Sequence, residues 1–264
     1  MRIVCFVNNN LVGLRVLEYL RTRGEDIAAV VVHPNGRAKY GQEIAMLADG
    51  RLINGAKLRE PETIQTIRDL APDIGVSAYF GYILKKEMLD IFPSGVLNLH
   101  PGYLPYNRGA NPNVWPIIEG TPAGVTLHWM DQGIDTGPII RQEVCEVAPC
   151  DTGESLYRRL ETLAIYLFRE FWPPSVEDLQ IRKGQEYGEA TVHRVSDLKV
   201  LDEIDLDTPI APRLLLNRLR ARTFPPYEGC YFISEGRKVL VSVNLRLAEG
   251  NGDAGAPRVG KVGA

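Results

Sequence analysis

Three polar side chains suited to acyl-transfer chemistry, Asn98, His100 and Asp135, fall within one stretch of the chain. Asn98 and His100 are two residues apart at the end of an expected strand, GVLNLH, so their side chains leave the strand on the same face. Asp135 lies in GIDTG, a glycine-flanked loop between two expected strands. A carboxylate beside an imidazole orients it and raises its pKa, and an asparagine amide can donate to a developing oxyanion. The three residues therefore indicate an acyl-transfer site that lacks a nucleophilic Ser or Cys.

Each of these residues also has a structural interpretation. An asparagine at a strand end is commonly a turn residue, an isolated histidine is often satisfied by the backbone, and an aspartate between glycines often caps a turn. We expect His33 and His193 to be structural. His128, in VTLHWM, either approaches the site from the neighbouring strand or is a core histidine.

The elements that position these residues follow from the alternation of apolar runs with helical periodicity. Buried strands are expected at residues 2–7, 27–33, 73–80 and 95–100, and helices at 11–24, 43–48, 62–70 and 85–91. This order is typical of a three-layer, Rossmann-like α/β domain with a mostly parallel sheet. Ligands bind beyond the carboxyl ends of the strands in such sheets, which is where Asn98 and His100 lie.

The second half of the chain adds further elements and a smaller part. We expect a helix at 111–119, an alternating strand at 124–130, a strand at 138–144, an amphipathic helix at 152–172, a helix at 211–221 and a hairpin at 229–245. Thr152 is the expected N-cap of the long helix, Pro173 and Pro174 end it, and the hairpin turns at Glu235 and Gly236. The predicted organisation is a catalytic domain at 1–178, a small α+β part at 179–247 and a flexible tail at 248–264.

Composition excludes several classes of protein. The 264 residues are 45% hydrophobic and 24% charged, so we expect a packed core. The formal charge is −3, which argues against a protein whose main function is to bind nucleic acid. Four scattered cysteines and no recognisable signal peptide favour the cytoplasm, and no apolar run is long enough to predict a membrane span. The phosphate-loop, dinucleotide, zinc-protease and nucleophile-elbow motifs are absent, and no metal is expected. Asn9 and Asn10 follow the first strand, where they either cap the next helix or hold an anion from the substrate.

At these residues the sequence resembles the folate-dependent formyltransferases, which act on glycinamide ribonucleotide, methionyl-tRNA or amino sugars. The combination of NLHPGYLPYNRGANP with GVTLHWMDQGIDTGP is similar to the signature of that family, and the resemblance covers about residues 1 to 175. It implies transfer of a formyl group from N10-formyltetrahydrofolate to a primary amine. By this resemblance Asn98 and His100 stabilise the oxyanion, His100 takes the amine proton, and Asp135 orients His100 and assists proton transfer.

The resemblance also implies where the folate lies. The pterin is expected against Phe80, Gly81, Tyr82, Ile83 and Leu84, and against Asp131, Gln132, Gly133 and Ile134. The alternative for Phe80 and Tyr82 is that they are core aromatics.

The acceptor amine is less clear from the sequence. The segment YNRGANPNVWPIIEGTPAGVTLH looks most like the sugar N-formyltransferases, which modify an amino sugar on a nucleoside diphosphate such as a dTDP-4-amino-4,6-dideoxyhexose. Arg108 could hold the sugar or a phosphate through its planar fork, or it could be a solvated loop residue. A homodimer is expected from the family.

Two alternatives remain open. The first is methionyl-tRNA formylation, because the segment with Arg218, Arg220 and Arg222 is similar to the start of that enzyme's C-terminal domain. Against it, residues 191–264 hold 11 Lys and Arg and 9 Asp and Glu, and end in the expected tail where that enzyme has a larger domain. The second is a binding protein for folate or a nucleotide sugar that kept the fold without catalysis.

Overall fold

The structure, a computed structural model, describes residues 1–34, 39–172, 183–185 and 190–248. Its largest element is a seven-stranded sheet with the order β3-β2-β1-β4-β5-β7-β8. The strands are β1 (Arg2–Val7), β2 (Asp26–Val32), β3 (Leu52–Asn54), β4 (Ile74–Ala78), β5 (Val96–His100), β7 (Ala123–Trp129) and β8 (Ile139–Cys145). Strands β1 to β5 are parallel, whereas β7 and β8 each pair antiparallel with their neighbours. The mostly parallel sheet predicted from the sequence is confirmed.

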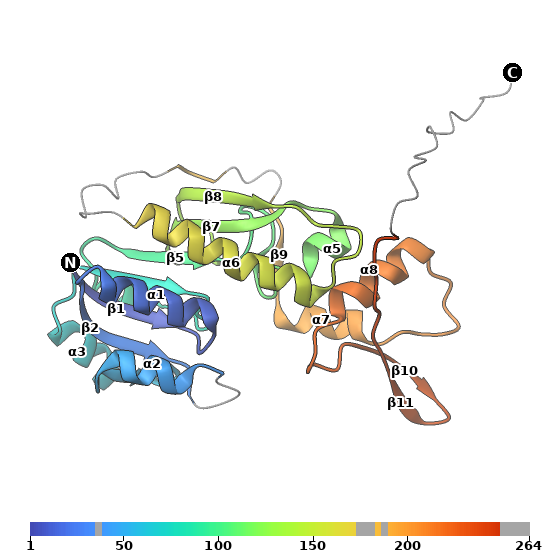
Figure 1. Cartoon of the computed structure of the whole chain (residues 1–264). Helices are drawn as coiled ribbons and strands as arrows, with labels where there is room; N and C mark the ends of the chain where they lie inside the picture. Colours follow the sequence, from blue (N-terminus) through green and yellow to red (C-terminus); the bar gives the residue numbers. More distant parts are fainter. Residues whose placement is uncertain (35–38, 173–182, 186–189, 249–264) are drawn as a thin grey trace, which may run out of the picture.

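Helices cover both faces of this sheet and make the three layers (Figure 1). Helices α1 (Leu11–Thr22), α2 (Gly41–Ala48) and α6 (Gly153–Phe171) bury their apolar sides in one core cluster. Helices α3 (Pro61–Asp69) and α4 (Lys86–Leu89) belong to a second cluster on the opposite face. Two separate cores follow, because alternate residues of a strand point to opposite faces.

Strand β7 differs from the expectation of an alternating strand, since all seven of its residues are buried. Val125 and Leu127 pack in the core with α6. The polar residues between them are buried too. Thr126 donates to the carbonyl of Gly102 and accepts from the amide of Leu104. The loop after β5 therefore covers the face that the pattern assigned to solvent, and hydrogen bonds offset the burial of its polar groups.

Helix α6 begins as the sequence predicts. The hydroxyl of Thr152 accepts from the amide of Ser155, and the Ser155 hydroxyl accepts from the amide of Thr152. The predicted stops at Pro173 and Pro174 lie outside the described residues.

The smaller C-terminal part packs against one end of the sheet domain (Figure 1). It contains β9 (Val192–His193), α7 (Val195–Asp202), α8 (Pro212–Arg222) and the hairpin β10 (Cys230–Ser234) with β11 (Arg237–Val241). Helix α8 packs on α6 and on α5 (Trp115–Glu119). The approach to α6 is close, because a Cβ on Gly153 would lie 2.2 Å from the Ala221 carbonyl oxygen.

The hairpin turns at Glu235 and Gly236, both with positive φ, as predicted.

Several other elements differ from those expected. The edge strand β3, the 3-10 turn at Gly55–Lys57 and helix α7 were not predicted. Helices α4 and α5 are shorter than their periodicity suggested. All but the first residue of the expected tail lies outside the described residues, and no described helix is long and apolar enough to cross a membrane.

Candidate active site

The structure brings Asn98, His100 and Asp135 together at the carboxyl end of β5. Asn98 and His100 are only 7% and 5% exposed, and Nδ1 of His100 lies 3.5 Å from Oδ2 of Asp135. All three line a cavity of about 530 Å³. This is the size range of small-molecule sites, and its place at the strand ends is where a doubly wound sheet binds ligands.

Asp135 is held in a constrained position between two imidazoles. Its φ of 52° is in the left-handed region, which is unusual outside glycine and is often found at functional sites. The carboxylate accepts a 2.8 Å hydrogen bond from the amide of Gly109, and lies 3.5 Å from His100 and 3.6 Å from His128. Burial acts to raise the pKa of Asp135, but the two histidines and the Gly109 amide outweigh it and hold the pKa below its usual range. The carboxylate is therefore ionised at neutral pH.

His100 has the opposite balance. Burial lowers the pKa of His100 and outweighs the charge of Asp135, which acts to raise it. The imidazole is therefore neutral near pH 7 and able to accept a proton. Its Nε2 lies 3.3 Å from the carbonyl oxygen of Asn107. A Cβ on Gly102 would lie 2.6 Å from the same nitrogen, so only glycine leaves room for the ring there.

The loop that carries Gly109 is tied to the C-terminal part. Strand β6 (Arg108–Gly109) pairs in parallel with β9, and the amide of Ala110 donates to the carbonyl of His193. The His193 ring stacks on Trp115 at 3.8 Å and 10°, and His193 also lines the cavity. His193 was expected to be structural, and it is also one of the residues that line the cavity. The pairing of β6 with β9 thus links the residues after the sheet domain to the position of Asp135.

Most of the residues expected to hold a pterin line the cavity. Those that line it are Phe80, Gly81, Tyr82, Ile83, Leu84, Asp131, Gly133 and Ile134, whereas Gln132 is not among its lining residues. Tyr82 stacks on His33 at 4.4 Å, and the amide of Gly81 donates to Nε2 of His33. Phe80 lies against Phe6 of the core. Phe80 and Tyr82 therefore contribute to core packing and to the cavity wall at once.

Of the two asparagines expected to hold an anion, Asn10 lines the cavity and Asn9 does not. Asn10 caps α1 by accepting from the amide of Gly13, donates to the hydroxyl of Tyr157, and lines the cavity. Asn9 donates to the carbonyl of His33 and is not a lining residue, while its neighbour Asn8 is. Capping and a place at the cavity thus coexist at Asn10.

Arg108 does not line the cavity, and neither expectation for it describes its position. It is 4% exposed, and its Nε and Nη2 atoms both donate to Oε1 of Gln185, at 3.2 and 2.7 Å. The amide of Gln185 in turn donates to the carbonyl oxygens of Asp135 and Gly137. Arg108 is neither solvated nor directed to a ligand in this structure. Its guanidinium instead bonds Gln185, which in turn supports the Asp135 loop.

Two groups of cavity residues were missed by the sequence reasoning. Tyr79 and Tyr157, whose rings meet edge to face, both line the cavity, and among the described lining residues Arg194, which is exposed, is the one Lys or Arg. Arg194 follows β9, so only the β6–β9 pairing brings it to the site. No local pattern in the sequence signals that pairing.

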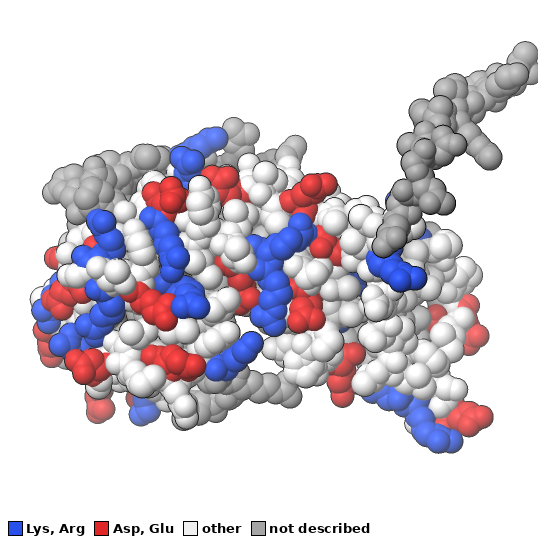
Figure 2. Space-filling model, viewed as in Figure 1, with Lys and Arg blue, Asp and Glu red and all other residues white. Residues whose placement is uncertain are grey.

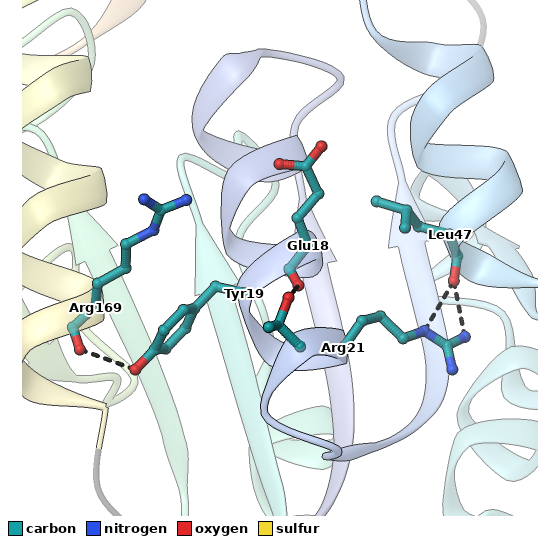
Figure 3. Close-up of a pocket in the computed structure, with 6 residues that line it drawn as sticks. Glu18, Tyr19, Arg21, Leu47 and Arg169 are labelled. Atoms are coloured by element: carbon teal, nitrogen blue, oxygen red, sulfur yellow. Dashed lines mark hydrogen bonds between the residues drawn. The ribbon is translucent and has the colours of Figure 1, made fainter.

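A second hollow, of about 600 Å³, lies between α1, α2 and α6 (Figure 3). It is at the carboxyl end of α1 and therefore at the amino ends of the parallel strands, away from Asn98 and His100. Its polar groups bind one another: Arg21 donates twice to the carbonyl of Leu47, and the Tyr19 hydroxyl donates to the carbonyl of Arg169. Because these polar groups bond to one another, we interpret the hollow as a packing gap between helices and not as a ligand site.

Sequence comparison identifies the relatives of both parts of the chain. Residues 1–170 match the family described as formyl transferase, and residues 197–247 match the N-formyltransferase dimerization C-terminal domain. Methionyl-tRNA formyltransferase of Geotalea daltonii is 34% identical over 264 residues, which covers 97% of this chain and 82% of that protein.

Solved structures give a second set of relatives. A 4-N formyltransferase from Francisella tularensis is 28% identical with a TM-score of 0.75, covering 94% of this chain and 98% of that one. The formyltransferase PseJ from Anoxybacillus kamchatkensis, in complex with UDP-4,6-dideoxy-4-formamido-L-AltNAc and tetrahydrofolate, is 27% identical with a TM-score of 0.54, covering 76% and 89%.

Proposed function

The chain belongs to the formyltransferase family, and we propose that it moves the formyl group of N10-formyltetrahydrofolate to the primary amine of a nucleotide-linked amino sugar. The observation that carries this proposal is the cluster of a neutral imidazole, an ionised carboxylate and a buried amide at the wall of one cavity. These three groups supply a base, its orienting partner and an oxyanion donor. The cluster needs no nucleophilic side chain, because the acceptor amine is itself the nucleophile.

The steps follow from the charges of the three groups. The amine nitrogen attacks the formyl carbon, and the amide of Asn98 stabilises the oxyanion that forms. Neutral His100 takes the proton that the amine loses, and Asp135 stabilises the resulting imidazolium. The bond from the formyl carbon to N10 of the folate then breaks, and N10 receives the proton from the His100 imidazolium, which returns to its neutral form as tetrahydrofolate leaves.

The donor is assigned to the side of the cavity formed by residues 80–84 and 131–134. This side joins aromatic and aliphatic surface to exposed backbone, which suits a flat heterocycle with polar edges. Tetrahydrofolate in the complex of PseJ supports a folate donor.

The nucleotide sugar is assigned to the part of the cavity where Asn8, Asn10 and Tyr157 offer amide and hydroxyl groups. Arg194 replaces Arg108 as the candidate for the diphosphate, because Arg194 is an exposed residue that lines the cavity whereas Arg108 is buried and bonded to Gln185. The UDP-linked sugar in the complex of PseJ supports a sugar acceptor.

Methionyl-tRNA is the second candidate acceptor, and the 34% identity with the Geotalea enzyme favours it. The charges argue against it. Lys and Arg are interspersed with Asp and Glu on the face in Figure 2. The three arginines of α8 that suggested tRNA binding are engaged within the protein: Arg218 donates to carbonyls at the end of α7, Arg220 to those of Ala148 and Asp151, and Arg222 pairs with Asp202.

We also propose that the protein is a homodimer formed through its C-terminal part. The matching dimerization domain supports this assembly. Large apolar side chains are exposed there, including Leu214, Leu216, Ile233 and Leu240. Exposed apolar surface of this kind commonly marks an interface.

An assay with a panel of acceptors tests the proposed reaction. The protein is incubated with N10-formyltetrahydrofolate and either dTDP- or UDP-linked 3-amino and 4-amino sugars, or methionyl-tRNA, and formylated product is detected by mass spectrometry. We expect product from at least one nucleotide sugar and none from the tRNA. Formylation of the tRNA alone would overturn the sugar assignment, and no transfer to any acceptor would contradict the reaction itself.

A further inference from the structure

We propose that His128 is a positioning residue that fixes the amide of Asn98 with its NH2 group, rather than its oxygen, toward His128. It does so as the tautomer whose Nδ1 carries the hydrogen. The inference rests on the proposed role of Asn98 in formyl transfer and adds a residue on the neighbouring strand to the site. His128 lies directly opposite Asn98 in the antiparallel pairing of β5 with β7.

The tautomer of His128 follows from its backbone contact. Nδ1 lies 2.9 Å from the carbonyl oxygen of Trp129. A carbonyl oxygen can only accept, so Nδ1 must carry the hydrogen. In a neutral imidazole the other nitrogen, Nε2, then has no hydrogen and can only accept. The side chain is 1% exposed, so water does not replace either contact.

The orientation of Asn98 follows from that tautomer. Nδ2 of Asn98 lies 3.0 Å from Nε2 of His128. If the amide were turned over, its oxygen would face a lone pair, and two acceptors would meet in a buried site. The bonding partners of the two side chains thus determine the direction of the Asn98 amide. One N–H of Asn98 is used on His128, and the other stays available to an oxyanion in the cavity.

Asp135 is the other group that faces His128, and it does not take this role. Its Oδ1 lies 3.6 Å from Nε2, which is too long for a hydrogen bond, whereas the Asn98 contact at 3.0 Å is not. His100, the remaining titratable neighbour, meets His128 edge to face with ring centroids 6.2 Å apart. The close polar contacts of His128 are therefore with Asn98 and with its own backbone.

Two substitutions separate positioning from simple packing. His128→Gln carries an amide oxygen near the place of Nε2 and keeps an acceptor for Asn98, while His128→Leu fills the space without one. We expect His128→Leu to lower kcat by about tenfold to a hundredfold, short of the full loss of an oxyanion donor, with KM for both substrates little changed. His128→Gln should restore most of kcat. Equal losses in both variants, or a change confined to KM, would overturn the proposal.

The tautomer can be read without measuring activity. The chain has four histidines, so ¹⁵N-histidine spectra of the wild-type protein, compared with those of His128→Gln, assign the His128 ring. We expect a protonated Nδ1 and an unprotonated Nε2 at pH 7.5. A protonated Nε2 would refute the proposal even if His128→Leu failed to fold. Absence of formyl transfer in the wild type would instead contradict the proposed function, and the spectrum would still decide the tautomer.

Discussion

The carboxylate oxygen of Asp135 that lies 3.5 Å from Nδ1 of His100 also accepts the amide hydrogen bond of Gly109 at 2.8 Å. A single oxygen thus joins the proposed base to the loop that β9 holds in place. Movement of that loop would therefore move Asp135, the partner of the proposed base His100. The C-terminal part therefore supports the site even though none of the three central residues comes from it.

The pH dependence of turnover should report the pKa of His100. Burial lowers the pKa of His100, so we expect the acid limb of kcat/KM to have its midpoint below 6.5, with activity lost as pH falls and the ring is protonated. Asp135 stays ionised over this range. Because Asp135 acts to raise the pKa of His100, Asp135→Asn should lower it further. An NMR titration of the His100 ring tests both statements, and a pKa that rises in Asp135→Asn would contradict them.

Asp135→Asn should also lower kcat by about 10²- to 10⁴-fold, the usual contribution of acid–base catalysis, while folate affinity stays close to that of the wild type. The reason is that Asp135 contacts the histidines and Gly109, whereas the proposed pterin surface is built mainly from its neighbours. Steady-state kinetics and a folate-binding titration measure the two effects. Wild-type turnover in this variant would remove Asp135 from the site.

Gly102→Ala should inactivate the protein through His100. The added methyl carbon would lie 2.6 Å from Nε2 of the ring, so the ring must leave its present position beside Asp135. We expect a large fall in kcat with a circular dichroism spectrum like that of the wild type. Gly184→Ala is the matched control, because a Cβ there meets no atom of the described residues within 4 Å. Full activity in Gly102→Ala would show that the ring is not where the chemistry requires it.

Arg194→Gln should raise KM for the nucleotide sugar by about tenfold, the effect of losing one charged hydrogen bond, and leave KM for the folate unchanged. Arg59→Gln, at an exposed arginine that is not among the cavity-lining residues, is the control. Arg108→Gln is expected to act differently. It should lower kcat, because Arg108 supports the Asp135 loop through Gln185. The assignment of the diphosphate to Arg194 fails if only Arg108→Gln changes the sugar KM.

The proposed dimer should dissociate when charge is placed on the exposed C-terminal apolar surface. Leu240 on β11 is 52% exposed, and Leu240→Glu should give a monomer in sedimentation velocity. Val144→Glu, at a 67% exposed position on β8 of the sheet domain, should leave the dimer intact. A wild-type protein that sediments as a monomer would rule the assembly out.

The clustering of Asn98, His100 and Asp135 could be anticipated because part of its signal is local. The spacing of Asn98 and His100 on a strand gives their common face, and the glycines around Asp135 mark a loop at the same sheet edge. Strand β7, which precedes this loop, runs antiparallel to β5, so the contact of Asp135 with His100 depends on the loop and not on parallel strand order. Thr152 and the turn at Glu235 and Gly236 were predicted for the same reason, since capping and turn chemistry act over a few residues.

Features that depend on distant partners could not be predicted. Arg108 was a candidate for the substrate, but its partner Gln185 is 77 residues away and no pattern connects them. The pairing of β6 with β9, which brings His193 and Arg194 to the cavity, involves two-residue strands that carry no periodicity. The alternation in β7 predicted an exposed face, and the loop after β5 covers it. In each case a long-range contact overrides the local signal.

Single-turnover transfer of a ¹³C-labelled formyl group from N10-formyltetrahydrofolate to an amino sugar nucleotide, followed by ¹³C NMR, tests the central claim most directly. We predict that the wild-type protein moves the label to the sugar nitrogen. His100→Asn should bind the folate with unchanged affinity and transfer the label at least about a hundredfold more slowly. Transfer by His100→Asn at the wild-type rate would contradict the claim that His100, with Asn98 and Asp135, forms the formyl-transfer centre.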